Sequence, residues 1–330
     1  MTDDDVTEAR ELGLAASLPR YDAPVLDIVA KPPFLHEDTV LHGFVLRSDM
    51  GDLQTAIDRL FEPLGLRYQV ETSAALLTAL YVGRARSTEG RYADLGWSSE
   101  IDVAFWALAR GPDGLVWIPF YMFVDSGVAL IAGREIYGYP KQLARFERDM
   151  TTLNSDPTVA VRTDFFRPRV AGPAPVVNDV LVRIRAARAG VDFLAKEGFR
   201  EEETRITERI DEETFLERFS VAMGRPPGLI NDLTLPYGTP RGVSVPMLLL
   251  KQFRDAAAPD RACYRSAVRV DTRSVGNIEI VEIKDRFVVD LTPSGSHPIA
   301  ADLGLTSGMV AEAVFAIRQD FNVNHATLLP

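Results

Sequence analysis

Lys141 is the lysine of this chain whose sequence surroundings best suit a chemical role, and it lies in the segment 133–144, GREIYGYPKQLA. The sequence has only five lysines against thirty-one arginines, so where it needs a positive charge alone it almost always uses arginine. Unlike a guanidinium, the amine of a lysine can lose its proton and then act as a nucleophile. A lysine held among glycines, tyrosines and a proline is therefore a candidate amine nucleophile. The same spacing also fits a solvated surface lysine that follows a turn, and the spacing alone does not decide between these two interpretations.

The bulk composition excludes several classes of function. The 330 residues are 46% apolar and 25% charged, which is typical of a soluble globular protein. A net charge of −11 with no basic stretch argues against binding to nucleic acid or to anionic membranes. The acidic N-terminus lacks the features of a signal peptide, and the most apolar stretch, 115–123, is interrupted by Pro119 and is too short to span a bilayer. We therefore expect a cytoplasmic, soluble protein with no nucleic-acid or membrane partner.

No residue pattern predicts a metal site or an organic cofactor. The single cysteine, Cys263, excludes an internal disulfide, and the histidines lack the spacing of metal ligands, so we interpret them as structural. Glycine-rich nucleotide-binding loops and the Gly-x-Ser-x-Gly motif are also absent. We expect neither a cofactor nor a metal. The four histidines are His36, His42, His297 and His325.

The elements that must position Lys141 are predicted to be mostly strands. Residues 1–25 are expected to form a flexible leader and 26–330 a single domain. After a strand at 40–46, Asp49 is a good N-cap for an amphipathic helix. Gly-Pro-Asp-Gly at 111–114 predicts a hairpin. The further predicted strands, rich in β-branched and aromatic residues, are 76–82, 101–109, 115–124, 128–132, 159–165, 245–250, 263–270, 277–283 and 287–291.

The region 174–240 interrupts this pattern with apolar residues at helical spacing. Asn178 or Asp179 can cap one helix and Asp211 another, and the charged stretch between them is interpreted as a solvated helical face. A short helix is also predicted at 307–317. The whole pattern predicts an α+β fold with a mostly antiparallel β core, peripheral helices and a helical insertion at about 174–240.

The residues around Lys141 resemble the active-site signature of the acetoacetate decarboxylase family. In that signature a Gly-Arg-Glu triplet precedes an aromatic residue, a proline and a lysine, and here the triplet is 133–135 and the second part is Tyr139-Pro140-Lys141. Weaker likenesses to the family's N-terminal strand and helix, glutamate-bearing segment and C-terminal strands lie at 44–50, 97–100 and 278–298. The resemblance covers about 40–170 and 243–318. It implies an acetoacetate decarboxylase-like β-barrel or cone and a homo-oligomer.

The resemblance also implies roles for individual residues. Lys141 falls on the family's Schiff-base lysine and Glu100 on its active-site glutamate, although a surface glutamate in a polar turn is the alternative for Glu100. Asp102 would share the strand face of Glu100. An iminium at Lys141 is itself an electron sink, so this chemistry needs no cofactor. The candidate supporting or substrate-binding residues are Arg134, Glu135, Tyr139 and Gln142.

The chain departs from the family at two positions. The family's decarboxylases carry a second lysine directly after the first, where this chain has Gln142, and an ungapped alignment places Thr39 at the family's substrate-binding arginine. For Lys141 to act as a nucleophile near neutral pH, its pKa must fall by roughly 3 to 4 units from its ordinary value. Without a second lysine, our hypothesis is that burial lowers it. The side chains expected to exclude water are Tyr139, Phe105 and Trp106.

Three functions follow from these residues. The leading hypothesis is a cofactor-independent Schiff-base lyase on a small or medium oxo acid, with β-keto-acid decarboxylation as its reaction. The second keeps the nucleophile but changes the reaction to that of an aldolase-dehydratase or cyclase of pyruvate or another 2-oxo acid, which Gln142 and Thr39 favour. The third is a non-catalytic ligand-binding homologue with the same fold.

Overall fold

The computed structural model describes residues 29–147, 158–168, 175–187, 207–225, 235–237 and 246–329, and strands dominate them. The helices and helical turns are α2 (Met50–Phe61), η1 (Glu62–Leu64), η2 (Gly90–Leu95), α3 (Gly127–Ala132), the π-helical turn η3 (Gly133–Tyr137), α4 (Glu212–Ala222) and α5 (Ile299–Asp302). The strands are β1 (Phe34–Arg47), β2 (Gln69–Ser87), β3 (Ser98–Gly111), β4 (Gly114–Val124), β5 (Lys141–Leu143), β6 (Arg145–Phe146), β7 (Val159–Phe166), β8 (Val176–Ala186), β9 (Thr207–Arg209), β10 (Met247–Arg254), β11 (Ala262–Ile283), β12 (Phe287–Leu291), β13 (Met309–Val310) and β14 (Ala313–Leu328).

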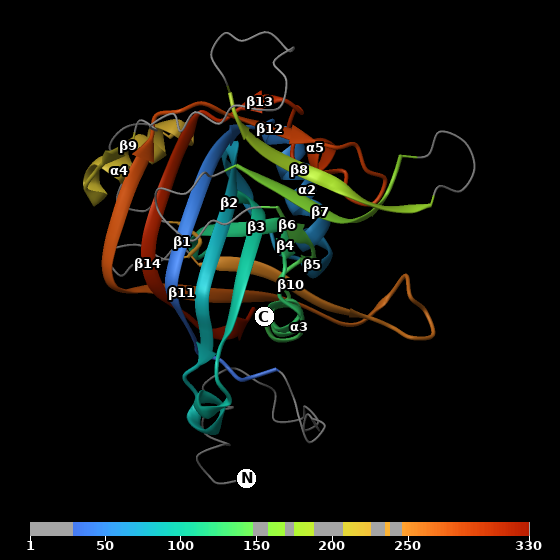
Figure 1. Ribbon diagram of the computed structural model, residues 1–330. Coiled ribbons are helices and arrows are strands. Elements are labelled where there is room, and N and C mark those ends of the chain that lie inside the picture. The colour runs from blue at the N-terminus through green and yellow to red at the C-terminus, as the bar shows by residue number, and fades with distance from the viewer. Residues whose placement is uncertain are drawn as a thin grey trace.

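Among the described residues, nine strands form one sheet that curls into a ring (Figure 1). The order is β10-β11-β14-β1-β2-β3-β4-β5, with β9 added beside β11. The ring closes where β10 returns to β4: Met247 pairs with Trp117, and the Trp117 amide donates to the Pro246 carbonyl at 2.9 Å. Closure satisfies strand edges and creates an interior lined by alternate side chains.

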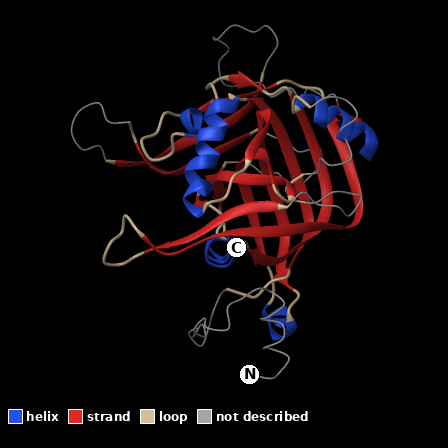
Figure 2. Cartoon of the chain, turned by 180° about the vertical axis from the view of Figure 1, so that it is seen from behind, coloured by secondary structure: helices blue, strands red, loops and turns tan. Residues whose placement is uncertain are grey.

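A second sheet packs against the outside of the ring. Its five strands among the described residues run β13-β12-β8-β7-β6. One apolar cluster fills the space between the two sheets and includes Phe44, Phe123 and Phe287. A second apolar cluster lies inside the ring and extends to α4, where Phe215 and Phe219 pack on Phe315. The helices lie at the periphery of the strands (Figure 2), and the predicted α+β fold is confirmed.

The helix α2 forms as its sequence predicts. The Asp49 side chain accepts hydrogen bonds from the amides of Gly51 and Asp52, and thus caps two of the first unpaired N–H groups. Leu53, Ile57 and other apolar residues at helical spacing face the core between the sheets. The predicted hairpin is also confirmed, since Gly111 pairs with Gly114 at the β3–β4 turn.

Two predicted elements have the wrong type. Residues 128–132 were predicted to form a strand but belong to α3, because the Ser126 hydroxyl accepts from the Ala129 amide and starts a helix. Residues 307–317 were predicted to form a helix but contain β13 and the start of β14. Val314 and Ala316 of β14 belong to the cluster between the sheets and Phe315 and Ile317 to the cluster inside the ring, so both faces of the strand are covered and its apolar run shows no alternation.

The predicted helical insertion is only partly helical where the structure describes it. The segment expected to follow the Asn178 or Asp179 cap is strand β8, which pairs with β7 and β12. The helix predicted after Asp211 is confirmed as α4, and the Asp211 side chain accepts from the Thr214 amide. The leader 1–25 and much of 174–240 lie outside the described residues. None of the described helices has the length and apolarity required to cross a membrane.

Candidate active site

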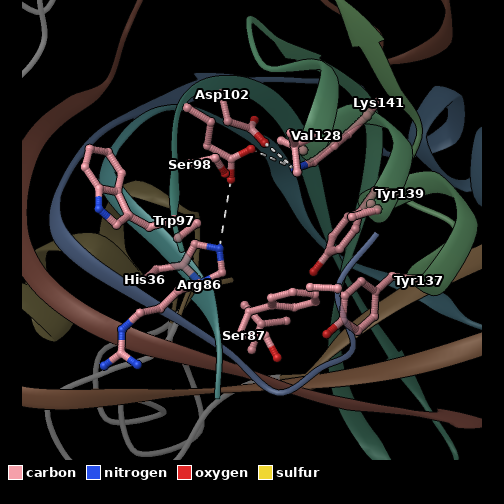
Figure 3. A pocket seen from close by; sticks show the side chains of 18 of the residues that line it. His36, Arg86, Ser87, Trp97, Ser98, Asp102, Val128, Tyr137, Tyr139 and Lys141 are labelled. Atoms are coloured by element: carbon pink, nitrogen blue, oxygen red, sulfur yellow. Dashed lines mark hydrogen bonds and ion pairs between the residues drawn. The ribbon is translucent and has the colours of Figure 1, made fainter. Parts of the chain in front are cut away.

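Lys141, Glu100 and Asp102 converge on the inside of the ring. Lys141 is the first residue of β5, which runs parallel to β4 and pairs there with Met122. Glu100 and Asp102 are two residues apart on β3, the next strand beyond β4, so strand alternation turns both side chains to one face. Figure 3 shows the Lys141 side chain pointing towards Asp102. The topology therefore brings together residues some forty positions apart in the sequence.

The amine lies between the two carboxylates. Lys141 Nζ is 3.3 Å from Glu100 Oε2, a hydrogen bond, and 3.7 Å from Asp102 Oδ2. Lys141 is 7% exposed, Glu100 6% and Asp102 2%. Asp102 Oδ1 is buried and has no hydrogen-bond partner among the described residues. A surface role for Lys141 or Glu100 does not fit this geometry, and the unpaired oxygen of Asp102 is available to a ligand.

The residues just before Lys141 hold its side chain in place. Gly133 leaves room for it, because a Cβ there would lie 2.7 Å from Lys141 Cδ. Gly138 has φ +83° and packs against the β10 backbone, where a Cβ would lie 2.5 Å from Lys251 Cα. Arg134 is exposed and donates from Nη1 to the Lys141 carbonyl at 3.0 Å, so it supports the lysine through its backbone. Glu135 is exposed to solvent.

Tyr139 forms part of the wall beside the amine. Its ring centroid lies 5.6 Å from Lys141 Nζ, and its hydroxyl donates to Met247 Sδ at 3.4 Å. Trp106 is buried in the same interior cluster and donates from Nε1 to the Thr78 hydroxyl at 2.9 Å. Phe105 belongs to the cluster on the other side of the sheet, so it does not wall the site as predicted.

The Gln142 side chain points away from the site. Strand alternation directs it to the opposite face of β5, where His297 Nε2 donates to Gln142 Oε1. Gln142 is not among the cavity-lining residues, so the prediction that it supports the site directly is wrong. A lysine at this position would also point away from Lys141 Nζ. The absence of a second lysine therefore removes no cation from the neighbourhood of the amine.

His36, on β1, reaches the site, and sequence reasoning missed it. The register of β1 against β14 shifts between His36 and Thr39, at the bulge where Asp38 has φ +54°. Strict alternation from Thr39 would turn Glu37 inwards, but the bulge turns His36 inwards instead. His36 Nε2 then lies 3.9 Å from Glu100 Oε1, and its ring stacks on Phe321 at 4.7 Å.

Thr39 does not take a substrate-binding position. It is fully buried, donates its hydroxyl to the Gln319 carbonyl and does not line the cavity. The residue that accommodates the bulge is Gly83 on β2, which lies opposite it, because a Cβ there would come 2.9 Å from Asp38 Cβ. Without a structure, nothing connects these two residues.

Burial and charge set the protonation states of the three ionisable neighbours. Burial disfavours the charged amine, but the carboxylates of Glu100 and Asp102 outweigh it, so the pKa of Lys141 is raised. The hypothesis that burial lowers this pKa is wrong, because the fold buries two carboxylates with the amine. Burial raises the pKa of Asp102 to about 7 in spite of Lys141. Burial lowers the pKa of His36 to about 4, so near neutral pH its contact with Glu100 is not an ion pair.

These side chains line one cavity of about 370 Å³, a volume typical of small-molecule sites. Its wall combines the amine and carboxylates with apolar and aromatic side chains such as Tyr137, Tyr139, Met122 and Phe321. Within the described residues, no group of three histidine, cysteine or acidic side chains is placed to hold a metal. The cavity is therefore suited to an organic ligand that places an electrophilic group at the amine.

The sequence matches no family model, and a search of curated proteins found no relative. Solved structures do match in fold. Acetoacetate decarboxylase from Legionella pneumophila aligns with a TM-score of 0.57 at 12% identity, over 96% of this chain and 93% of that chain.

Two other solved structures match over similar lengths. For an acetoacetate decarboxylase-like enzyme from Sphingomonas wittichii the TM-score is 0.53 at 13% identity, over 94% of this chain and 98% of that chain. For the enduracididine biosynthesis enzyme MppR complexed with pyruvate the TM-score is 0.52 at 13% identity, over 94% of this chain and 93% of that chain. The chain therefore has the acetoacetate decarboxylase-like fold that the residues around Lys141 predicted.

Proposed function

We propose that this protein is an enzyme that forms a Schiff base between Lys141 and the carbonyl carbon of a small or medium oxo acid, and that it decarboxylates a β-oxo acid. The observation that carries this proposal is a buried primary amine at the wall of a cavity, 3.3 Å from one carboxylate and 3.7 Å from a second. The likeness of the fold to acetoacetate decarboxylase supports it.

Asp102 supplies the proton transfer that frees the amine. In the form in which Asp102 is ionised, Lys141 Nζ passes a proton to it, and a buried ion pair becomes a neutral amine and a neutral carboxylic acid, which removes two charges from a water-poor site. The amine attacks the substrate carbonyl, and a proton shift from nitrogen to oxygen gives the carbinolamine. Asp102 then donates its proton to the departing hydroxyl group, which leaves as water. The product is an iminium linked to Lys141.

The iminium accepts the electrons of the bond that breaks. In a β-oxo acid the carbon–carbon bond to the carboxylate cleaves, carbon dioxide leaves and the bonding pair forms an enamine. A negative Glu100 close by destabilises the substrate carboxylate more than neutral carbon dioxide, so it favours this loss. The enamine carbon then takes up a proton, and water hydrolyses the iminium to release a ketone and restore Lys141.

The neutral imidazole of His36 favours a second candidate function. In an iminium formed from a 2-oxo acid such as pyruvate, a neutral base can remove a proton from the adjacent carbon. The resulting enamine would attack an aldehyde, as in an aldolase-dehydratase or cyclase. That the MppR structure holds pyruvate supports this alternative. Both candidates need the same adduct on Lys141.

Borohydride trapping tests the proposal. The protein is incubated with acetoacetate or with pyruvate and then reduced, released carbon dioxide is measured, and the modified residue is located by mass spectrometry. We expect one reduced adduct on Lys141 and release of carbon dioxide from acetoacetate. Lys141→Arg should abolish the adduct, because arginine keeps the charge but does not deprotonate. Lys251→Arg is the matched control, since burial lowers the pKa of Lys251 and makes it the competing amine.

The outcomes separate the three hypotheses. Labelling of Lys141 by pyruvate, with no carbon dioxide released from acetoacetate, supports the aldol-type enzyme instead. Labelling that survives in Lys141→Arg and disappears in Lys251→Arg contradicts the assignment of the nucleophile. No adduct with either oxo acid in the folded protein contradicts both enzymatic functions and leaves the ligand-binding homologue.

A further inference from the structure

The cavity extends well beyond the space that a small oxo-acid head requires. Asp102 pairs with Leu80 on β2, and the lining continues along β2 to Ser87. The seven residue steps from Leu80 to Ser87 correspond to roughly 20 Å at about 3.3 Å per residue. A four-carbon oxo acid contains three carbon–carbon bonds of about 1.5 Å each, so it occupies only the end near Lys141. The rest of the cavity is available to a larger substituent.

The far part of the cavity is apolar and aromatic. Leu95 and Trp97 line it, yet they are 63% and 62% exposed, which is unusual for side chains of this size. Figure 3 shows Trp97 across the cavity from Lys141, with His36 between its ring and the interior. A broad aromatic surface of this kind gains free energy when an apolar or aromatic group covers it.

The charges of the lining exclude a second anionic group on the ligand. Among the lining residues the basic side chains of lysine and arginine are those of Lys141 and Arg86. Arg86 Nε lies 3.1 Å from Glu37 Oε2, so its charge is already paired. His36 is neutral near physiological pH, and Glu100 and Asp102 would repel a further anion. The far part of the cavity therefore suits an uncharged substituent.

We propose that the substrate carries, beyond its reacting carbonyl, an uncharged apolar or aromatic substituent that lies along the cavity towards Leu95 and Trp97. This substrate class rests on the proposed function, because it assumes that the carbonyl reacts with Lys141. It distinguishes the substrate from acetoacetate and pyruvate, which have no such substituent, and from dicarboxylic or phosphorylated oxo acids, whose second anion would find no unpaired cation among the lining residues.

Three methyl ketones that differ only in their tails test this proposal. They are acetone, benzylacetone and levulinate, of which the last two share one chain and end in a phenyl group or a carboxylate. The measured quantity is the ketone concentration that gives half-maximal borohydride labelling of Lys141. We expect benzylacetone to label at a concentration about tenfold or more below that of acetone, the order expected for burial of a phenyl ring. Levulinate should show no advantage over acetone.

Trp97→Ala should remove most of the advantage of benzylacetone over acetone. Phe253→Ala is the matched control, because Phe253 is also an exposed aromatic residue, on β10, and does not line the cavity. Equal labelling by the three ketones, or preference for levulinate, would overturn the substrate class and leave the Schiff base intact. Lack of labelling by any ketone would overturn the proposed function itself. If Trp97→Ala changes the sedimentation of the protein but not the ketone preference, a second copy of the chain covers this surface and the substrate class is wrong.

Discussion

At the scale of the residue, His36 brings a neutral imidazole to the cavity beside an amine and two carboxylates. Its Nε2 atom lies 3.9 Å from Glu100 Oε1, and the stack on Phe321 fixes the plane of the ring. Because burial lowers its pKa to about 4, His36 can accept a proton throughout the physiological range. This position suits a group that moves protons at the carbon next to the iminium, not one that forms the iminium.

His36→Gln should therefore separate two steps. We expect borohydride labelling of Lys141 to persist, while solvent deuterium enters the methyl group of pyruvate about 100-fold more slowly, as measured by NMR. Loss of a general base typically costs a factor of this order. His325→Gln is the control, because His325 lies on β14 and does not line the cavity. Unchanged exchange in His36→Gln, or loss of Lys141 labelling, would show that His36 does not have this role.

Single residues of the site were predictable to the extent that a local motif marks them. The segment around Lys141 and the position of Glu100 resemble the family's motif, and the structure brings these two side chains within 3.3 Å. Gln142 and Thr39 were misjudged because alignment gives a position along a strand but not the face it occupies. The face depends on alternation and on a bulge, and no local residue pattern identifies either one.

At the scale of the element, the bulge shared by β1 and β2 determines which side chains enter the cavity. Asp38 adopts φ +54° opposite Gly83, and at this level β1 shifts its register against β14 and β2 shifts its register against β3. Aspartate and asparagine tolerate this left-handed conformation, whereas a β-branched residue there is strained by about 1–2 kcal/mol. The bulge should therefore depend on the residue type at position 38.

Asp38→Val should lower the free energy of unfolding by about 1–2 kcal/mol, as measured by urea denaturation. It should also slow the entry of solvent deuterium into the methyl group of pyruvate, since a regularised β1 turns His36 away from the cavity. Asp38→Asn is the matched control and should retain both properties, because asparagine readily occupies left-handed backbone conformations. If the valine variant matches the asparagine variant in both measurements, the backbone conformation at Asp38 does not position the site.

The elements that were predicted correctly have distinctive local signals, and the others do not. Asp49 caps α2 and Asp211 caps α4 as expected, since a capping side chain acts within its own turn. The start of β14 was mistaken for a helix because a strand with both faces buried in apolar clusters has no period of two. The ring itself depends on the β10–β4 closure, which joins residues about 130 positions apart and has no local signature.

At the scale of the whole molecule, the closed ring imposes a free-energy cost in order to hold its site. It buries Glu100, Asp102 and Lys141 in an interior that is otherwise largely apolar, and the ion pair compensates only part of the desolvation. The clearest sign is Asp102, whose pKa rises from 3.8 to about 7. Between these two pH values the carboxyl holds its proton in the folded state and releases it in the unfolded state, so the stability of the whole molecule depends on its titration.

The sign of this dependence follows from proton counting. Between about pH 4 and pH 7 the folded state binds one proton more at Asp102 than the unfolded state, so the free energy of unfolding falls as pH rises. At about 1.4 kcal/mol per pH unit, the loss of free energy of unfolding over this window approaches about 4 kcal/mol and then levels off.

Asp102→Asn should abolish this contribution, and its stability relative to the wild type should rise between about pH 5 and pH 8 in urea denaturation. Asp113→Asn, in the exposed β3–β4 turn, should follow the wild type. Parallel curves for Asp102→Asn and the wild type would mean that the folded state does not raise the pKa of Asp102.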